Sequence, residues 1–236
     1  MNKEIQKKYK KATFLDVKKV NTEHAQTAVE LDIDDRMFKT APRDAFITLK
    51  DHKPDFTTNP KVRMINPTKP EVGKVAMKIV DNIVKEIRAK ERNIKQAIST
   101  GDVIEWFKEI KDKKNLKFIN WDLENFYASI TPTLVEQSLD WAMEYVHITA
   151  QQRKIIIQSC QSFLYSDGQP WMKKGDDNFD VEMGAYHGAQ ICELVGLFLM
   201  SRLTHIKELS AIIYRDDVLG VTRCTSRQQE KCDKQL

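Results

Sequence analysis

The sequence lacks several features that define common protein classes. Its longest uninterrupted apolar stretch, LVGLFLM at residues 194–200, is far shorter than the roughly 20 residues that cross a bilayer. The charged N-terminus is followed by no apolar segment, so no secretory signal is expected. These absences predict an intracellular protein, in the nucleus, the cytoplasm or both, with no membrane partner.

Disulfide and zinc patterns are also missing. The 4 cysteines have no C-x-x-C spacing, and the 5 histidines are scattered without an H-E-x-x-H helix. Reduced, structural thiols are therefore expected, and a zinc enzyme is disfavoured. With 8 glycines and 41% hydrophobic residues in 236, the composition suits an ordinary globular protein of one large domain or two small ones.

Acidic residues are scarce toward the N-terminal end, although the net charge of the chain is only +4. Residues 1–20 hold seven lysines against two acidic residues, and residues 50–96 hold twelve Lys and Arg against six Asp and Glu. Lysine and arginine displace condensed counterions from phosphates, so a basic end suits a polyanionic partner. A solvated helix face explains the charge alone equally well.

Hydrophobic periodicity predicts a mixed order of strands and helices. Segments that alternate apolar and polar residues are expected to be strands, at 44–50, 61–67 and 116–122. Apolar residues recurring every three or four positions, with capping residues, predict helices. These helices are 74–98, 102–110 after a cap at Ser99 or Thr100, 131–146, 149–165, the buried 188–203 and the polar 226–236. The order predicts an α+β fold, with helices packed on a small antiparallel sheet.

Two adjacent aspartates, Asp216 and Asp217, lie between the β-branched runs of AIIYRDDVLGV at residues 211–221. A tight turn explains them by itself, because Asp accepts turn geometry and hydrogen-bonds its own backbone. A hairpin tip can also project carboxylates at a divalent metal. Asp122 ends the strand 116–122, and pairing within one sheet could bring it beside Asp216. Such carboxylates could share two Mg²⁺ ions, as in-line phosphoryl transfer requires.

Four motifs, in the correct order, resemble those of reverse transcriptases. Residues 44–222 carry the resemblance, which includes the Y-x-D-D box of the family at Tyr214 to Asp217. The strings similar to motifs A, B and C are FINWDLENFYASI (118–130), MGAYHGAQICELVGLFLMSRL (183–203) and IIYRDDVLG (212–220). Upstream, LKDHKP (49–54) and VRMINP (62–67) resemble fingers motifs of retroelement reverse transcriptases, most closely those of Penelope-like elements. The resemblance implies a polymerase palm-and-fingers fold.

The resemblance also implies catalytic roles. Asp122 and Asp216 would ligate two Mg²⁺ ions, with Mn²⁺ as an alternative metal, and Asp217 would be the accessory carboxylate of the catalytic set. Tyr127 matches the steric gate, a flat ring that collides with a ribose 2′-hydroxyl and so selects deoxynucleotides. Packing as a core aromatic is the alternative for Tyr127.

The implied nucleotide-binding residues lie in the fingers and in motif B. Arg63 matches the arginine that clamps the triphosphate, a task that suits a planar bidentate guanidinium. Lys50 and Lys53 would assist it. Gly184 and Gly188 would let the backbone approach the nucleotide or template, which a Cβ would obstruct.

Motif B departs from the family pattern. The segment GAYHGAQ replaces the common Pro-Gln-Gly or Gly-Ser-Pro-Leu run, and it supplies Gln190 as the template contact. Glu193, a charge inside an apolar helix, is expected to pair with a base such as Arg202 rather than to contact substrate.

The resemblance implies three regions and an activity. They are a basic N-terminal extension (1–43), fingers (44–115) and a palm with motifs A, B and C (116–236) that ends before a thumb. The implied enzyme is the RNA-directed DNA polymerase of a mobile element, which adds dNTPs to a DNA primer on an RNA template. Without a thumb, the chain is expected to be a fragment, a degenerate copy or a core that needs help.

Two alternatives stay open. One is a catalytically inactive or domesticated reverse-transcriptase-like module that binds nucleic acid or a protein; the missing thumb favours it, and the intact aspartates oppose it. The other is a viral-type RNA-dependent RNA polymerase. Such enzymes usually have Asp where this chain has Tyr127, five residues after the first catalytic aspartate.

Overall fold

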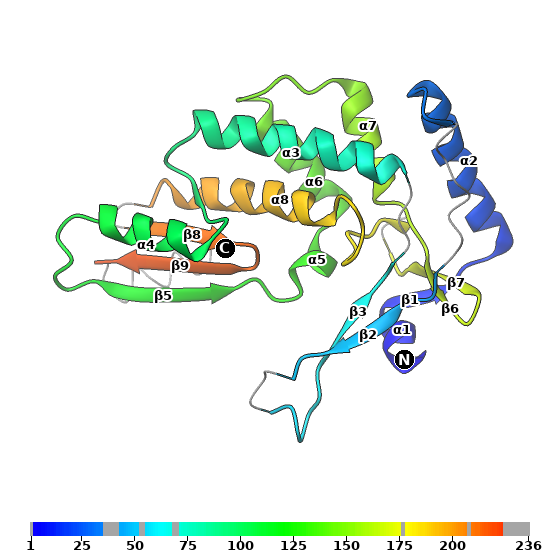
Figure 1. Cartoon of the computed structure of the whole chain (residues 1–236), viewed down its shortest axis with the longest axis horizontal. Helices are drawn as coiled ribbons and strands as arrows, with labels where there is room; N and C mark the ends of the chain where they lie inside the picture. The colour runs from blue at the N-terminus through cyan, green and yellow to red at the C-terminus, as the bar shows by residue number, and fades with distance from the viewer. Residues whose placement is uncertain are drawn as a thin grey trace.

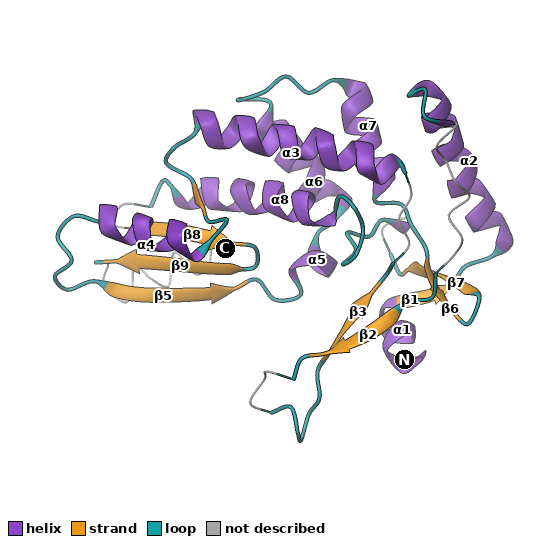
Figure 2. Cartoon of the chain, in the orientation of Figure 1, coloured by secondary structure: helices purple, strands orange, loops and turns teal. Residues whose placement is uncertain are grey.

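The computed structural model describes residues 2–34, 43–51, 55–67, 71–175, 178–206 and 209–223. These residues form a mixed α and β structure with a four-stranded sheet, a three-stranded sheet and a separate two-stranded hairpin (Figure 1, Figure 2). The helices are α1 (Asn2–Lys8), α2 (Phe14–Glu30), α3 (Val72–Lys90), α4 (Thr100–Glu109), α5 (Phe126–Ser129), α6 (Pro132–Ala142), α7 (Ala150–Ser159) and α8 (Gly188–Leu203). Within the described ranges, none of them combines the length and apolar character needed to cross a bilayer.

The strands are β1 (Tyr9–Lys11), β2 (Phe46–Leu49), β3 (Val62–Ile65), β4 (Lys95–Gln96), β5 (Lys117–Asp122), β6 (Leu164–Ser166), β7 (Gln169–Lys173), β8 (Leu209–Tyr214) and β9 (Asp217–Thr222). The four-stranded sheet has the order β4, β8, β9, β5. β8 and β9 form the expected hairpin, and β5 pairs antiparallel with β9. β4 joins the opposite edge in parallel, which differs from the small antiparallel sheet that the sequence predicted.

Helices cover both faces of this sheet. Ile213 of β8 belongs to the core formed with α3 and α8, whereas the next residue back, Ile212, packs with Trp106 of α4. Neighbouring strand residues point to opposite faces, so α8 and α4 lie on opposite sides. The Trp106 indole also donates a hydrogen bond to the Ser210 hydroxyl of β8 at 3.0 Å. The layers hold the β8–β9 hairpin rigidly from both sides.

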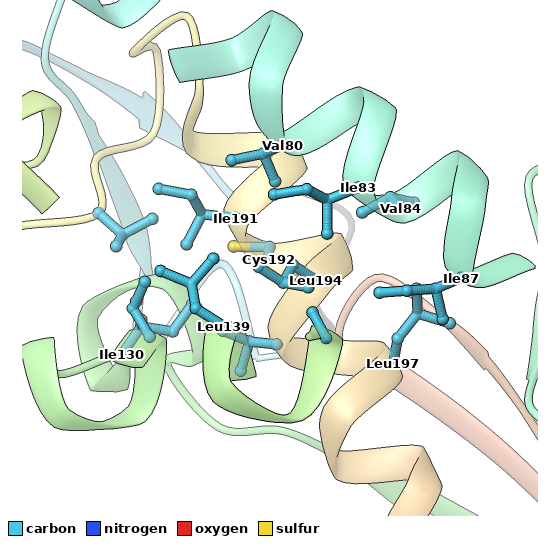
Figure 3. Packing of buried hydrophobic residues seen from close by; sticks show 14 of the residues in the cluster. Val80, Ile83, Val84, Ile87, Ile130, Leu139, Ile191, Cys192, Leu194 and Leu197 are labelled. Carbon is cyan, nitrogen blue, oxygen red and sulfur yellow. The ribbon is translucent and has the colours of Figure 1, made fainter. Parts of the chain in front are cut away.

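The main core lies between α3, α6 and α8. Figure 3 shows apolar side chains of α3 facing those of α8, with side chains near α6 closing the cluster from below. Those labelled are Val80, Ile83, Val84 and Ile87 on α3, Ile191, Cys192, Leu194 and Leu197 on α8, and Ile130 and Leu139. The apolar residues of α3 recur at three and four positions, which is the amphipathic pattern that predicted this helix.

The hairpin of β2 and β3 projects away from the helices, as Figure 1 shows. Beside its base lies the three-stranded sheet of order β1, β7, β6. The β6–β7 turn has left-handed backbone at Asp167 (φ 54°) and Gly168 (φ 71°), the geometry that twisted two-residue hairpins need.

β1 pairs with β7 and so joins residues 9–11 of the predicted N-terminal extension to a strand of the predicted palm. The boundaries of the three predicted regions stay predictions.

Several expected helices end earlier than periodicity indicated. α3 stops at Lys90, because Glu91 is extended and residues 95–96 pair with β8 instead. α7 stops at Ser159, because Phe163 and Leu164 are buried in the region of the three-stranded sheet. α6 ends at Ala142 rather than Val146. Polar segment 226–236 lies outside the described residues.

Candidate active site

Three aspartates meet where β5 ends and β9 begins. The register pairs Asp122 directly with Asp217. Asp216 occupies the turn between β8 and β9, and its carbonyl accepts a hydrogen bond from the Leu123 N–H at 2.9 Å. All three side chains are exposed. The sheet thus places Asp122 beside Asp217 and Asp216, and the sharing of metal ions by their carboxylates stays a prediction.

Arg215, the first residue of this turn, has left-handed backbone with φ 57°. For a residue with a Cβ this conformation costs on the order of 1 kcal/mol, so the flanking strands must impose it. Its guanidinium lies 5.5 Å from the centre of the Tyr214 ring. A cation therefore accompanies the carboxylates at the hairpin tip.

A cleft of about 540 Å³ opens beside the aspartates. Its lining combines the three aspartates and Arg215 with the β2–β3 hairpin, the α5 region and the segment 180–183. Lys50 and Arg63 line the hairpin side. Arg63 is exposed and Lys50 is half-buried, with the Lys50 N–H donating to the Lys61 carbonyl at 2.9 Å. Lys53 lies outside the described residues.

Tyr127 has both of the environments that the sequence left open. Its ring is half-buried and packs against the main core, and it also lines the cleft. Burial raises the pKa of the Tyr127 hydroxyl to about 12, helped by Cys192 and Asp216 and opposed by Arg215. The ring is therefore uncharged at neutral pH and presents a flat wall near the carboxylates.

The two motif B glycines are required by the fold itself. A Cβ on Gly188 would lie 2.5 Å from the Glu182 carbonyl oxygen, closer than real Cβ atoms approach. Gly184 has φ +108°, and a Cβ there would lie 2.6 Å from the Asn66 carbonyl oxygen. Neither glycine is among the described residues that line the cleft. Their contact with nucleotide or template therefore stays a prediction.

Gln190 follows on the first turn of α8. Its side-chain oxygen is buried and, within the described part of the chain, has no hydrogen-bond partner. It does not line the cleft as described. Its role as a template contact stays a prediction.

Glu193 pairs with a base, as expected, but the base is Arg88 of α3. The Arg88 guanidinium lies 3.3 Å from the Glu193 carboxylate. Arg88 also donates to the side-chain oxygen of Gln96 in β4, at 2.6 Å from Nη2. Arg202 instead stacks on Phe198, 4.9 Å from the ring centre. The pairing joins α3, β4 and α8.

Sequence reasoning missed the polar floor of the cleft, which Tyr9, Asn66, Asp180 and Glu182 help to form. The Asn66 amide donates to the Phe163 carbonyl at 3.1 Å and to the Glu182 carboxylate. Burial raises the pKa of Glu182, and the nearby charge of Asp180 raises it further. The sequence of residues 175–180 indicates a polar loop. No local pattern shows that Asp180 is buried, because its hydrogen-bond partner Tyr9 lies 171 residues away.

Hard oxygen donors make the aspartates suitable for Mg²⁺. Among the residues that the structure describes, no group of three or more His, Cys, Asp and Glu is placed to hold a metal ion. Mg²⁺ usually takes one or two carboxylates and completes its octahedron with water and substrate phosphates. The donors present fit that pattern.

Comparison with known proteins finds similarity in structure only. No protein-family model and no curated protein matches the sequence. Apo telomerase from Candida tropicalis, truncated from its C-terminal domain, is 11% identical, with a TM-score of 0.58 over 81% of this chain and 46% of that one. C. tropicalis telomerase in complex with a TWJ fragment of telomeric RNA is 13% identical, with a TM-score of 0.57 over 84% and 38%.

A viral enzyme matches as well. The BmCPV RNA-dependent RNA polymerase at its elongation state is 13% identical, with a TM-score of 0.52 over 97% of this chain and 23% of that one. The chain thus spans less than half the length of each of these three proteins. At such identities the likeness establishes the fold alone. The chain has an α+β fold of the polymerase palm-and-fingers kind, as the sequence predicted.

Proposed function

We propose that this chain carries the nucleotidyl-transfer core of an RNA-directed DNA polymerase. The observation that carries the proposal is the pairing of Asp122 with Asp217 beside Asp216, in the lining of a cleft that Lys50 and Arg63 also line. Carboxylates and cations in the lining of one cleft suit a substrate that brings phosphates and a divalent metal together.

In this proposal the residues that line the cleft bind the nucleotide, select its sugar and align the primer. The planar guanidinium of Arg63 binds the triphosphate of a dNTP by paired charge-assisted hydrogen bonds, and Lys50 adds charge beside it. The Tyr127 ring blocks the space that a ribose 2′-hydroxyl would fill. The fixed β8–β9 hairpin aligns the primer end with the nucleotide.

Asp122 and Asp216 are the residues that would hold Mg²⁺, or Mn²⁺ in its place, with Asp217 as the accessory carboxylate. When bound, two such ions would promote attack by the primer 3′-hydroxyl and neutralise charge on the transferred phosphate. Without a cation, neighbouring carboxylates repel one another, so metal binding relieves a cost that the fold creates.

The proposed partners are an RNA template, a DNA primer and dNTPs. A retroelement origin, of the Penelope-like type in particular, is part of the proposal and rests on the motifs LKDHKP and VRMINP. Likeness to telomerase, one structure of which holds telomeric RNA, supports nucleic acid as the partner.

The test is primer extension by the purified chain, with an RNA template, a DNA primer and Mg²⁺. We expect template-dependent addition of dNTPs in preference to rNTPs. A preference for rNTPs would favour the RNA-dependent RNA polymerase, to which the fold is also similar. Tight binding of template and primer with no addition in Mg²⁺ or Mn²⁺ would favour the inactive binding module.

A further inference from the structure

The helix that carries Tyr127 cannot hold its own position. α5 contains four residues, Phe126–Ser129, and follows a left-handed Asn125 with φ 52°. A single isolated turn is unstable in water, because nucleation fixes several residues for one hydrogen bond. The last carbonyls of any helix also lack partners within it. Contacts from outside α5 must therefore fix the Tyr127 ring.

One such contact comes from the last residue of β7. The Lys173 ammonium donates a hydrogen bond to the carbonyl of Ala128, the residue after Tyr127, at 3.1 Å. A cation at a helix C-terminus is electrostatically favourable. The Lys173 side chain is only 14% exposed, so its charge has little water around it and needs a partner.

Asp180 and Tyr9 complete a buried network with Lys173. The Asp180 carboxylate, 6% exposed, lies 3.1 Å from the Lys173 ammonium through Oδ1. Its other oxygen accepts a hydrogen bond from the Tyr9 hydroxyl at 2.6 Å. Tyr9 is also the register partner of Lys173 in the β1–β7 pairing. The network thus runs from the N-terminal strand to the Tyr127 helix.

Stability alone does not explain a buried ion pair. Removing two charges from water costs so much that well-packed apolar residues are often equally stable in their place. A directional hydrogen bond from a fixed ammonium to one carbonyl instead gives geometric precision. That precision matters where a ring must exclude a single hydroxyl group.

We infer that Lys173 is a positioning residue for sugar selection: with Asp180 and Tyr9 it fixes α5 so that the Tyr127 ring stays in the path of a 2′-hydroxyl. This inference rests on the proposed function of Tyr127. It makes β1, from the N-terminal region, a part of the site. Lys173 acts through Ala128 and does not itself contact the reacting atoms.

The experiment follows the Tyr127 ring by fluorine NMR of chain labelled with 3-fluorotyrosine, its signal assigned with Tyr127→Phe. The variant Lys173→Met with Asp180→Asn removes both charges of the ion pair together. We expect its Tyr127 signal to shift or broaden and its preference for dNTP over rNTP to fall about tenfold. Lys173→Arg, which keeps a charged donor, should retain the wild-type Tyr127 signal and the wild-type preference for dNTP over rNTP.

Lys174→Met is the matched control, because the neighbouring lysine donates to the Gln6 carbonyl of α1 rather than to α5. It should leave the Tyr127 signal and the sugar preference unchanged. If the double variant does not fold, Tyr9→Phe removes a single hydroxyl and should give a smaller shift of the same signal.

An unchanged Tyr127 signal in the folded variants would overturn the inference, as would a shifted signal with unchanged sugar preference. A wild-type chain that adds no nucleotide would refute the proposed function instead. The NMR comparison would still show whether Lys173 positions the ring.

Discussion

Single side chains in the cleft combine structural and chemical tasks. Tyr127 packs against the core and also lines the cleft that the carboxylates line. Glu182 is buried beneath the same cleft beside Asp180. Tyr127 allows a test that separates a role in folding from a role in sugar selection, and Glu182 allows a test of how its ionisation affects stability.

Tyr127→Val should relax sugar selection. Trimming the ring opens space for a 2′-hydroxyl without touching the metal-binding carboxylates, so rNTP use relative to dNTP use should rise by about tenfold, or about 1.4 kcal/mol. Competing single-nucleotide additions, run beside a thermal melt, measure both effects. A loss of roughly 3 kcal/mol of stability with unchanged sugar preference would identify Tyr127 as a core residue only.

Glu182→Gln should stabilise the protein increasingly as pH rises. Burial raises the folded-state pKa of Glu182 above the ordinary value of about 4.3, so the folded state binds more protons than the unfolded state between the two values. Wild-type stability therefore falls with pH in that window, by up to about 1.4 kcal/mol per pH unit, while the Gln variant lacks this dependence.

Denaturant unfolding across the pH range tests this, with Glu124→Gln as the control at an exposed carboxylate. The stability gain should be absent near pH 4 and grow above it. A gain of equal size at every pH would show that packing, and not ionisation, is responsible.

Helices and strands were predictable where their signals are local. The capping box of Thr149 with Gln152 starts α7 where the sequence placed it, and Ser99, one of the two expected caps, starts α4 two residues earlier than expected. The alternation that ends at Asp122 marks β5. Element ends were less predictable, because α3 gives way to β4 through pairing with β8, a distant strand.

The start of α8 depends on close backbone packing against the segment before it. Gly188→Ala should destabilise the protein by about 1 to 3 kcal/mol, since its Cβ would lie 2.5 Å from the Glu182 carbonyl oxygen. Gly101→Ala in α4 is the control: its nearest neighbour is 3.4 Å away, and alanine favours a helix by up to about 1 kcal/mol. Equal melting temperatures for wild type and Gly188→Ala would contradict the packing explanation.

At the scale of the whole molecule, the motifs predicted which segments line the cleft. They did not predict the buried polar contacts that hold these segments in place. Asp122, Asp216, Tyr127, Lys50 and Arg63 all line one cleft, and the roles that the resemblance implies for them stay predictions. The supporting network of Tyr9 with Asp180 was not visible, because 171 residues separate the two and neither lies in a motif. Long-range polar pairing leaves no periodic trace in a single sequence.

Binding of a template and primer should depend strongly on salt. The cleft is lined by four cations, Lys8, Lys50, Arg63 and Arg215. Lys50 and Arg63 are assigned to the triphosphate, which leaves Lys8 and Arg215 for the duplex; if each of these two meets a phosphate, affinity should fall by about 10-fold between about 50 and 200 mM salt. Lys8→Ala should lower the slope of log affinity against log salt by about 1, whereas Lys61→Ala, outside the cleft lining, should not.

Fluorescence anisotropy of a labelled RNA–DNA duplex at several salt concentrations gives these slopes. Equal slopes for wild type and Lys8→Ala would remove the N-terminal side of the cleft from the nucleic-acid path.

The replacement of Asp216 by Asn tests most directly whether the three aspartates form a metal-dependent active site. The change keeps the shape of the turn residue and removes a hard anionic ligand. Primer extension and a circular-dichroism melt are measured together, with Asp112→Asn as a control at an exposed aspartate outside the cleft lining. We predict that Asp216→Asn abolishes nucleotide addition at an unchanged melting temperature while Asp112→Asn remains active; near-normal extension by folded Asp216→Asn would contradict the catalytic role of the site.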